Sequence, residues 1–155
     1  MVKTLKEGKL NIEIHEMLNQ IDRITQKQEN GIFDKNGSAV DEEITYFNNW
    51  IKKMFKKEFP EYVEFVKIIN GFKFNELYVY SLDRKSKYNI FGLNEILCGD
   101  NELSDYIFFG DNRISLFCFS KNMGRYCILN KENGIIMQEY ETFDEIIIEA
   151  LKTAL

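Results

Sequence analysis

Apolar residues recur at two different spacings along this chain, and the change of spacing divides it into a helical first part and a β-rich second part. Between residues 10 and 28 they recur every three or four positions, with polar residues opposite, which predicts an amphipathic surface helix. Its apolar positions are Leu10, Ile14, Met17, Leu18, Ile21 and Ile24. A polar stretch over residues 29–37 then ends this helix with the turn dipeptides Asn30-Gly31 and Asn36-Gly37.

Two further helices are predicted before residue 72. Ser38, with Asp41 three positions later, resembles a capping box, and we expect the helix that it starts to run to about Lys57. Its expected buried positions are Ile44, Phe47, Ile51, Met54 and Phe55. Pro60 suits the first turn of a third helix, where a missing amide hydrogen costs nothing, and Asn70-Gly71 favours a left-handed end to that helix.

Beyond residue 71 the spacing becomes that of strands. A strand is predicted around Leu77 and Val79, and residues 89–105 are interpreted as a loop with about one helical turn over residues 94–97. Four β-rich segments follow, and the short turns between them favour antiparallel hairpins. The segments are Tyr106–Phe109, Ile114–Phe119, Arg125–Asn130 and Ile135–Tyr140. A closing helix is predicted from Thr142 to about Thr153.

This order of elements predicts a single α+β domain over residues 1–155, in which an antiparallel β-meander sheet packs with N-terminal helices and a closing C-terminal helix. Residues 1–37 form its N-terminal helical extension and residues 38–155 its core. The chain is 45% hydrophobic and 14% aromatic. A domain of this length and composition buries enough apolar surface to fold without a disulfide or a metal.

The balance of acidic and basic residues limits the kinds of partner that this protein is expected to bind. The chain has 25 acidic and 20 basic residues, for a net charge of −5. Nucleic acids and anionic lipids select basic surfaces, so we expect a basic protein partner, no direct nucleic acid and no membrane. The lysines at positions 52, 53, 56 and 57 are interpreted as a solvated helix face, with a nucleic-acid patch as the less favoured alternative. Without a signal peptide or a membrane-spanning apolar run, the expected location is cytoplasmic.

Residues that carry common enzyme chemistry are scarce. His15, the only histidine, lies on the first helix, which disfavours serine or cysteine triads and the common zinc sites. Cys118 and Cys127 are expected to face each other across a hairpin as buried apolar side chains, with a redox or metal pair as the less favoured alternative. The glycine spacing matches no phosphate-binding loop. We therefore assign no catalytic, cofactor or metal residue and expect a protein that is not an enzyme.

Five carboxylates are concentrated between residues 95 and 112, with no Lys or Arg among them. They are Glu95, Asp100, Glu102, Asp105 and Asp111. Their spacing matches neither a calcium-binding loop nor a recognisable glycosidase pair. We interpret these five residues as part of a surface that binds a partner protein; solvated loops without a role are the alternative.

Three short motifs, in this order, resemble the SUKH superfamily. The first is a hydrophobic-Pro-x-x-Tyr-x-x-Phe segment followed by Asn-Gly, and here it comprises Phe59-Pro60-Glu61-Tyr62, Phe65 and Ile69-Asn70-Gly71. The second is an apolar-Phe-Gly entry to a strand, here Ile107-Phe108-Phe109-Gly110-Asp111-Asn112 with Ser115-Leu116-Phe117. The third resembles the family's closing helix, here residues 142–147. The resemblance covers about residues 38–152.

The resemblance implies a non-enzymatic α+β binding module without a cofactor. The superfamily includes yeast cell-wall-assembly regulators and many bacterial immunity proteins, which neutralise a polymorphic or contact-dependent toxin by binding it. We therefore expect the partner to be a cognate toxin, and the acidic balance suits a basic nuclease. The alternative is a regulatory scaffold, like the yeast relatives, that binds several partners weakly.

Overall fold

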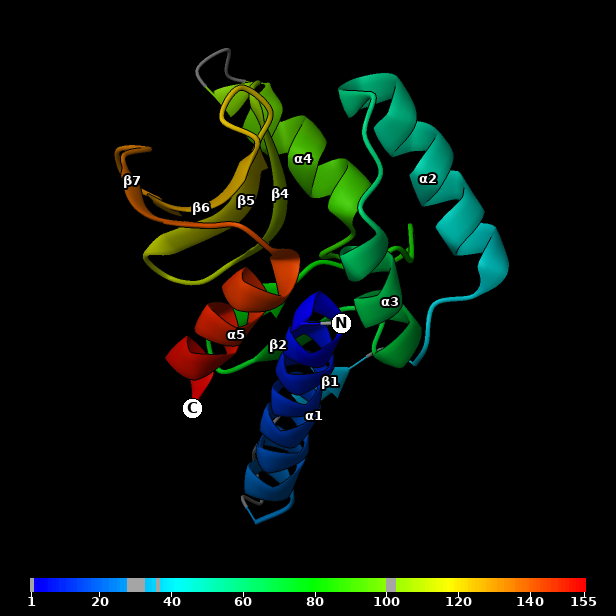
Figure 1. The fold of residues 1–155 in the computed structure, drawn as a ribbon, viewed down its shortest axis with the longest axis vertical. Coiled ribbons are helices and arrows are strands. Elements are labelled where there is room, and N and C mark those ends of the chain that lie inside the picture. The colour runs from blue at the N-terminus through cyan, green and yellow to red at the C-terminus, as the bar shows by residue number, and fades with distance from the viewer. Residues whose placement is uncertain (1, 28–32, 36, 100–102) are drawn as a thin grey trace.

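The computed structural model describes residues 2–27, 33–35, 37–99 and 103–155, and the side chains of residues 12–25, 37–99 and 103–155. These residues form one antiparallel sheet surrounded by helices (Figure 1). The elements, in chain order, are α1 (Val2–Lys27), β1 (Phe33–Lys35), α2 (Asp41–Phe55), α3 (Pro60–Ile68), β2 (Phe72–Phe74), β3 (Leu77–Val79), α4 (Ile90–Cys98), β4 (Tyr106–Asp111), β5 (Ser115–Ser120), β6 (Arg125–Asn130), β7 (Ile136–Tyr140) and α5 (Phe143–Ala154).

The sheet is a meander in which each strand pairs with the next strand along the chain. The order in the described part of the chain is β1 to β7, and every pairing is antiparallel. Cys118 lies opposite Cys127 and Leu116 opposite Leu129, as the short turn between β5 and β6 predicted. The predicted α+β class, the sequential order of the last four strands and the antiparallel pairing are confirmed.

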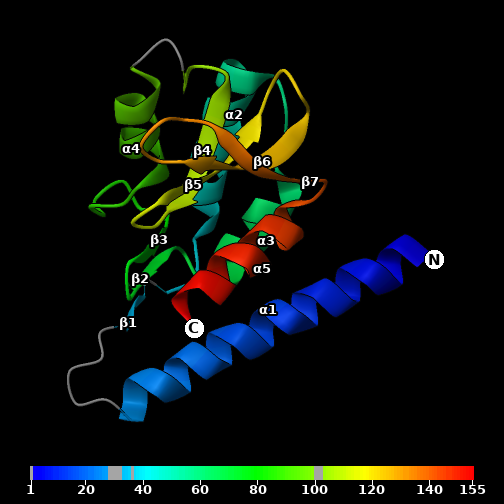
Figure 2. The same ribbon diagram turned by 90° about the vertical axis from the view of Figure 1, so that its left-hand side faces the viewer.

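Helix α5 lies between the sheet and α1 (Figure 2). Its five predicted core positions are all buried: Phe143, Ile146, Ile147, Ala150 and Leu151. Helix α1 runs along α5 and buries one stripe of side chains, consisting of Ile14, Met17, Leu18 and Ile21. These side chains belong to the same apolar core as the residues under the sheet, so α1 and the later elements share one core.

The three motifs that carry the family resemblance meet in this core. The ring centroid of Tyr62 on α3 lies 4.9 Å from that of Phe109 on β4 and 5.6 Å from that of Phe143 on α5. The Phe109 and Phe143 centroids are 5.4 Å apart. Glu61 also accepts a hydrogen bond from the backbone N–H of Phe143 at 2.9 Å, where its charge suits the start of α5. Segments distant in sequence are thus joined by ring packing and a helix cap.

The Asn70-Gly71 step turns the chain and also holds the segment after β3. The predicted left-handed end of the third helix was wrong, because α3 stops at Ile68 and Ile69 is already extended; Gly71, with a φ of +78°, turns the chain between the helix and β2. A methyl group on Gly71 would lie 2.8 Å from backbone atoms of Ser81. Asn70 Oδ1 accepts a hydrogen bond from the backbone N–H of Leu82 at 2.8 Å, and the Tyr62 hydroxyl donates to the carbonyl of Tyr80 at 3.0 Å. Hydrogen bonds from side chains of the first motif therefore hold residues 80–82 in place.

The predicted bounds of the second helix were wrong at both ends. Residues 37 and 39 make backbone hydrogen bonds to the end of α3, which draws Ser38 away from the helix start. Glu43 instead accepts a hydrogen bond from the backbone N–H of Val40 at 2.9 Å, and α2 begins at Asp41. At the other end Lys56 adopts a left-handed conformation and stops the helix at Phe55. Met54, expected in the core, is 55% exposed.

Four elements were missed or underestimated, including α1, which was predicted from residue 10 and begins at Val2. The structure has β1 and β2, each three residues long, where no strand was predicted. Residues 90–98, predicted to contain about one helical turn, form α4, because Asn89 caps this helix through the backbone N–H of Gly92 at 2.7 Å. The Asn94 side chain accepts from the N–H of Phe108 at 2.7 Å and donates to its carbonyl at 2.8 Å. The Asn94 side chain thus makes the hydrogen bonds that a neighbouring strand would make at Phe108, beyond the part of β4 that pairs with β3.

The close approach of β3 and β4 at Gly110 can be tested by adding a methyl group at this position. A methyl group at this position would lie 2.6 Å from the backbone oxygen of Tyr78, whereas one at Gly37 would have no neighbour within 4 Å. We expect Gly110→Ala to lower the free energy of unfolding by about 1–3 kcal/mol, because the added carbon has no room in a paired strand. Gly37→Ala, the matched control, should change it by less than about 0.5 kcal/mol. Urea denaturation measures both, and equal stabilities would show that the strands can separate without cost.

Candidate functional site

The predicted acidic residues lie on different parts of the fold. Glu95 is exposed on α4, whereas Asp100 and Glu102 lie outside the described residues. Asp105 precedes β4 and Asp111 ends it, so the length of the strand separates these two residues by about 20 Å. The Cys98 thiol lies 3.4 Å from the Tyr106 carbonyl, which places the C-terminal end of α4 beside the Asp105 end of β4. A role for the five acids in binding a partner remains a prediction.

Asp105 organises the turn between β5 and β6. Its carboxylate accepts a hydrogen bond from the Ser120 hydroxyl at 2.8 Å and another from the backbone N–H of Asn122 at 3.0 Å. Ser120 in turn accepts from the backbone N–H of Met123 at 3.1 Å. Part of the hydrogen-bonding capacity of Asp105 is thus used within the chain, although its side chain is half-buried and can still contribute to the surface potential.

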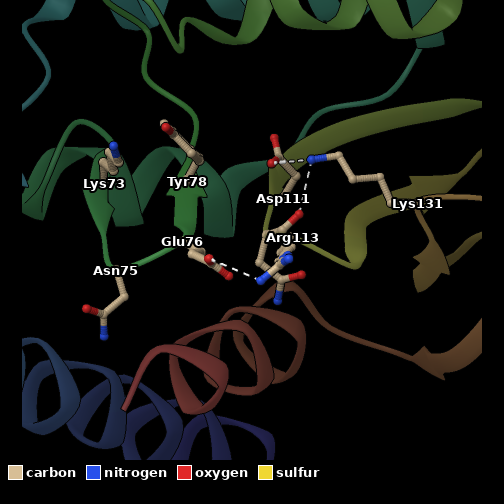
Figure 3. A pocket seen from close by; sticks show the side chains of 8 residues that line it. Lys73, Asn75, Glu76, Tyr78, Asp111, Arg113 and Lys131 are labelled. Atoms are coloured by element: carbon tan, nitrogen blue, oxygen red, sulfur yellow. Dashed lines mark hydrogen bonds and ion pairs between the residues drawn. The ribbon is translucent and has the colours of Figure 1, made fainter.

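Asp111 faces an open polar depression of about 220 Å³ at the other end of β4 (Figure 3). Its carboxylate accepts from the Tyr80 hydroxyl at 2.5 Å and from the Lys131 ammonium group at 3.0 Å. Lys131 also donates to the carbonyl of Asn112 at 3.1 Å. With only 17% of its side chain exposed, Asp111 holds β4 to the segment after β3 and to the turn after β6.

The remaining charges in this depression also have partners across it. Glu76 lies 3.9 Å from Arg113, and the Lys73 ammonium group lies 5.2 Å from the centre of the Tyr78 ring. Glu76 and Arg113 are both largely exposed, so this ion pair contributes little to stability. The sequence analysis singled out Asp111 but not Lys131, Glu76 or Arg113. Lys131 comes next to Asp111 only when the strands of the meander are assembled.

The thiol pair predicted on the central hairpin is buried. The Cys118 thiol donates to the carbonyl of Cys127 at 3.3 Å, and all three cysteines are free thiols. Burial raises the pKa of Cys118 well above its usual value, so the reactive thiolate is disfavoured. Among the residues that the structure describes, no group of His, Cys, Asp and Glu side chains is arranged to hold a metal.

The outer edge of β7 is a surface that the sequence analysis did not single out. β7 is the last strand of the sheet, and no neighbouring strand occupies its outer edge among the described residues (Figure 1). Four of its five residues are exposed and the fifth, Tyr140, is half-buried. The apolar run that enters the strand is also accessible, with Ile135 61% and Met137 45% exposed. Three consecutive apolar residues at the last predicted strand were the signal available in the sequence.

Carboxylates surround the other end of β7. The chain carries six acidic residues and no Lys or Arg between positions 132 and 151. Helix α5 packs against β7, and burial, followed by the charges of Glu149 and Glu145 on α5, raises the pKa of Tyr140. Glu139 and Glu141 are exposed on either side of Tyr140. The β7 edge, defined here as residues 135–141, therefore has an apolar half and an acidic half.

Two comparisons with known proteins find no match for this chain. No model of a protein family matches the chain, and a search of curated proteins finds no matching sequence. None of the helices in the described part of the chain is both long and apolar enough to cross a membrane. The site is therefore interpreted from its own geometry and from the motif resemblance.

Buried tyrosines predict a loss of stability in alkali. Burial raises the pKa of Tyr62 and Tyr126, and burial together with Asp111 raises that of Tyr80. These hydroxyls stay protonated in the folded protein while the unfolded chain releases their protons near pH 10. The contribution of these tyrosines to the free energy of unfolding should therefore be lost above pH 10, by up to about 1.4 kcal/mol per pH unit for each tyrosine, and the buried Cys118 thiol, whose pKa is also raised, adds a loss that begins about one pH unit lower.

Urea denaturation between pH 8 and 11.5, with tyrosinate absorbance followed at 295 nm, measures this loss. Tyr80→Phe should reduce the slope above pH 10, because one fewer buried group titrates on unfolding. Ionisation of all tyrosines near pH 10 without unfolding would contradict the assignment of these hydroxyls to a closed core.

Proposed function

We propose that this chain is a non-enzymatic immunity protein of the SUKH type. It acts in the cytoplasm and neutralises a cognate polymorphic or contact-dependent toxin by covering the surface with which the toxin binds its substrate. The favoured toxin is a basic nuclease, since such an enzyme carries positive charge where it binds its polyanionic substrate.

The observation that carries the proposal is the meeting of the three resemblance motifs in one place. Tyr62, Phe109 and Phe143 come from different motifs and pack as neighbouring rings, with centroids 4.9–5.6 Å apart. Glu61 from the first motif caps the helix that carries the third. The three motifs lie in one core, as a shared fold requires, and this agreement supports the resemblance and, through it, the family's role in binding.

The charge distribution supports a basic partner. The net charge is −5, and Glu95 is exposed on α4 without an ion pair within the described residues. Asp111 is less available, because Tyr80 and Lys131 already occupy its carboxylate. We therefore expect Glu95 to contribute more than Asp111 to attraction of a toxin, mainly by raising the association rate. Buried apolar contacts would supply most of the affinity.

Inhibition in this proposal requires no chemical step. A protein that occupies the nucleic-acid-binding surface of a nuclease excludes the substrate, and its carboxylates take the place of phosphate groups. The degree of protection then depends on the dissociation rate of the complex compared with the rate at which new toxin arrives.

The proposal predicts that a toxin domain is encoded beside the gene, and co-expression with that domain tests the function. We expect the protein to restore growth and to co-purify with that domain as a stable complex. Failure of both would exclude immunity.

Charge reversal then tests the acidic surface. Lysine substitutions at Glu95, Asp100 and Glu102 should slow association about tenfold or more at low salt and flatten its salt dependence, with dissociation changed less. Glu16→Lys, at an exposed position of α1, is the matched control. Stopped-flow binding measures these rates. A complex that forms at an unchanged rate would exclude this surface while leaving immunity intact.

A further inference from the structure

We infer that the β7 edge receives an extended, basic segment of the toxin, which adds a strand to the sheet. This inference rests on the proposed function, because it names the part of the toxin that is bound and the surface that binds it.

The backbone of β7 provides the first part of the argument. One side of the strand pairs with β6, and the sheet ends at its other side among the described residues. The outward N–H and C=O groups of such a strand can pair with an incoming extended chain, which is a common way for a sheet to bind a partner. Proteins usually protect such edges with charged side chains, above all lysine, with proline, with a bulge or with a covering element. Residues 135–141 contain neither lysine nor proline, and their only charges are the carboxylates of Glu139 and Glu141, which oppose a like-charged strand but attract a basic one.

The apolar half provides an anchor. Ile135, Ile136 and Met137 are consecutive and all at least 37% exposed. Consecutive exposed apolar side chains on an unpaired edge are costly in a protein that stays alone, because they favour non-specific association. Covering them with apolar side chains of a partner strand would supply the affinity that charge at the rim does not.

The acidic half determines which segment fits. Neighbouring strand residues face opposite sides of a sheet, so Glu139 and Tyr140 project from opposite faces. Glu139 pairs with Cys127 on one face, while Tyr140 pairs with Tyr126, which packs against Phe143 at the start of α5 on the other face. The charges of Glu145 and Glu149 on that helix act on Tyr140. An added strand would therefore meet carboxylates on both faces, which favours alternating lysine or arginine residues. Arg125 begins β6 beside this end and offsets part of the charge.

A second copy of the chain fits this edge less well than a basic partner. Two β7 strands that paired edge to edge would also bring together two stretches that each carry six acidic residues without a basic one. Repulsion between like charges opposes that pairing.

The turn that leads into β7 has a described neighbour from the segment before β4. A methyl group on Gly134 would lie 3.8 Å from Leu103 Cδ2. A toxin segment on the β7 edge would thus also lie near Leu103.

The test uses the full chain and the toxin domain from the co-expression experiment. Amide hydrogen exchange on the wild-type complex should show new protection of the outward-facing amides of residues 135–141, which exchange freely in the free protein, beyond the protection of the amides already paired with β6. Met137→Lys should weaken binding at least tenfold, mainly through faster dissociation. Glu139→Lys should mainly slow association. Met54→Lys, at a residue 55% exposed on α2, and Glu16→Lys on α1 are matched controls and should stay within twofold of wild type.

The outcomes separate the two proposals. If the toxin binds while the outward-facing β7 amides exchange freely and the β7 variants match their controls, the docking inference fails and immunity stands. If the toxin does not bind at all, both fail. If the free protein is a dimer with protected outward-facing β7 amides, the edge is occupied by a second copy and the docking inference is wrong. The exchange measurement needs no variant, so misfolding of Met137→Lys would not leave the question open.

Discussion

The contact on which the rest of this fold depends is the packing of Tyr62, Phe109 and Phe143. These rings join α3, the centre of the sheet and α5, and all three are almost completely buried. The Tyr62 hydroxyl remains satisfied because it donates to the Tyr80 carbonyl. A buried phenol without that partner would carry the desolvation cost of its hydroxyl, so the cluster works only with the chain after β3 in its observed path.

The same contact positions the surface proposed to bind the toxin. Glu61 and Thr142 together cap the start of α5: Glu61 accepts from the N–H of Phe143 and Thr142 from that of Glu145. Because β7 ends immediately before this cap, the direction in which α5 begins determines where the acidic half of the β7 edge lies. The core cluster and the binding surface are therefore linked through one short connection.

Polar side chains complete the sheet where strands are too short to do so. Asn94 forms hydrogen bonds with both backbone groups of Phe108, and Asn70 accepts a hydrogen bond from the backbone N–H of Leu82. A buried backbone group without a partner costs more than a typical hydrogen bond contributes, so these amides stabilise the chain where no neighbouring strand can. In contrast, the acidic half of the β7 edge is left at the surface, where water solvates it.

The sequence by itself determined the features that depend on neighbouring residues. Helical spacing predicted α1 and α5, and the short turn after β5 set the register that places Cys118 opposite Cys127, because side-chain direction and turn length are local properties. Only the tertiary structure decided the rest. The strands β1 and β2 are too short to give a pattern, and Lys131 meets Asp111 only when the meander is assembled. The exposure of β7 likewise depends on its place at the end of the sheet, since an edge strand and a central strand can have the same alternation of residues.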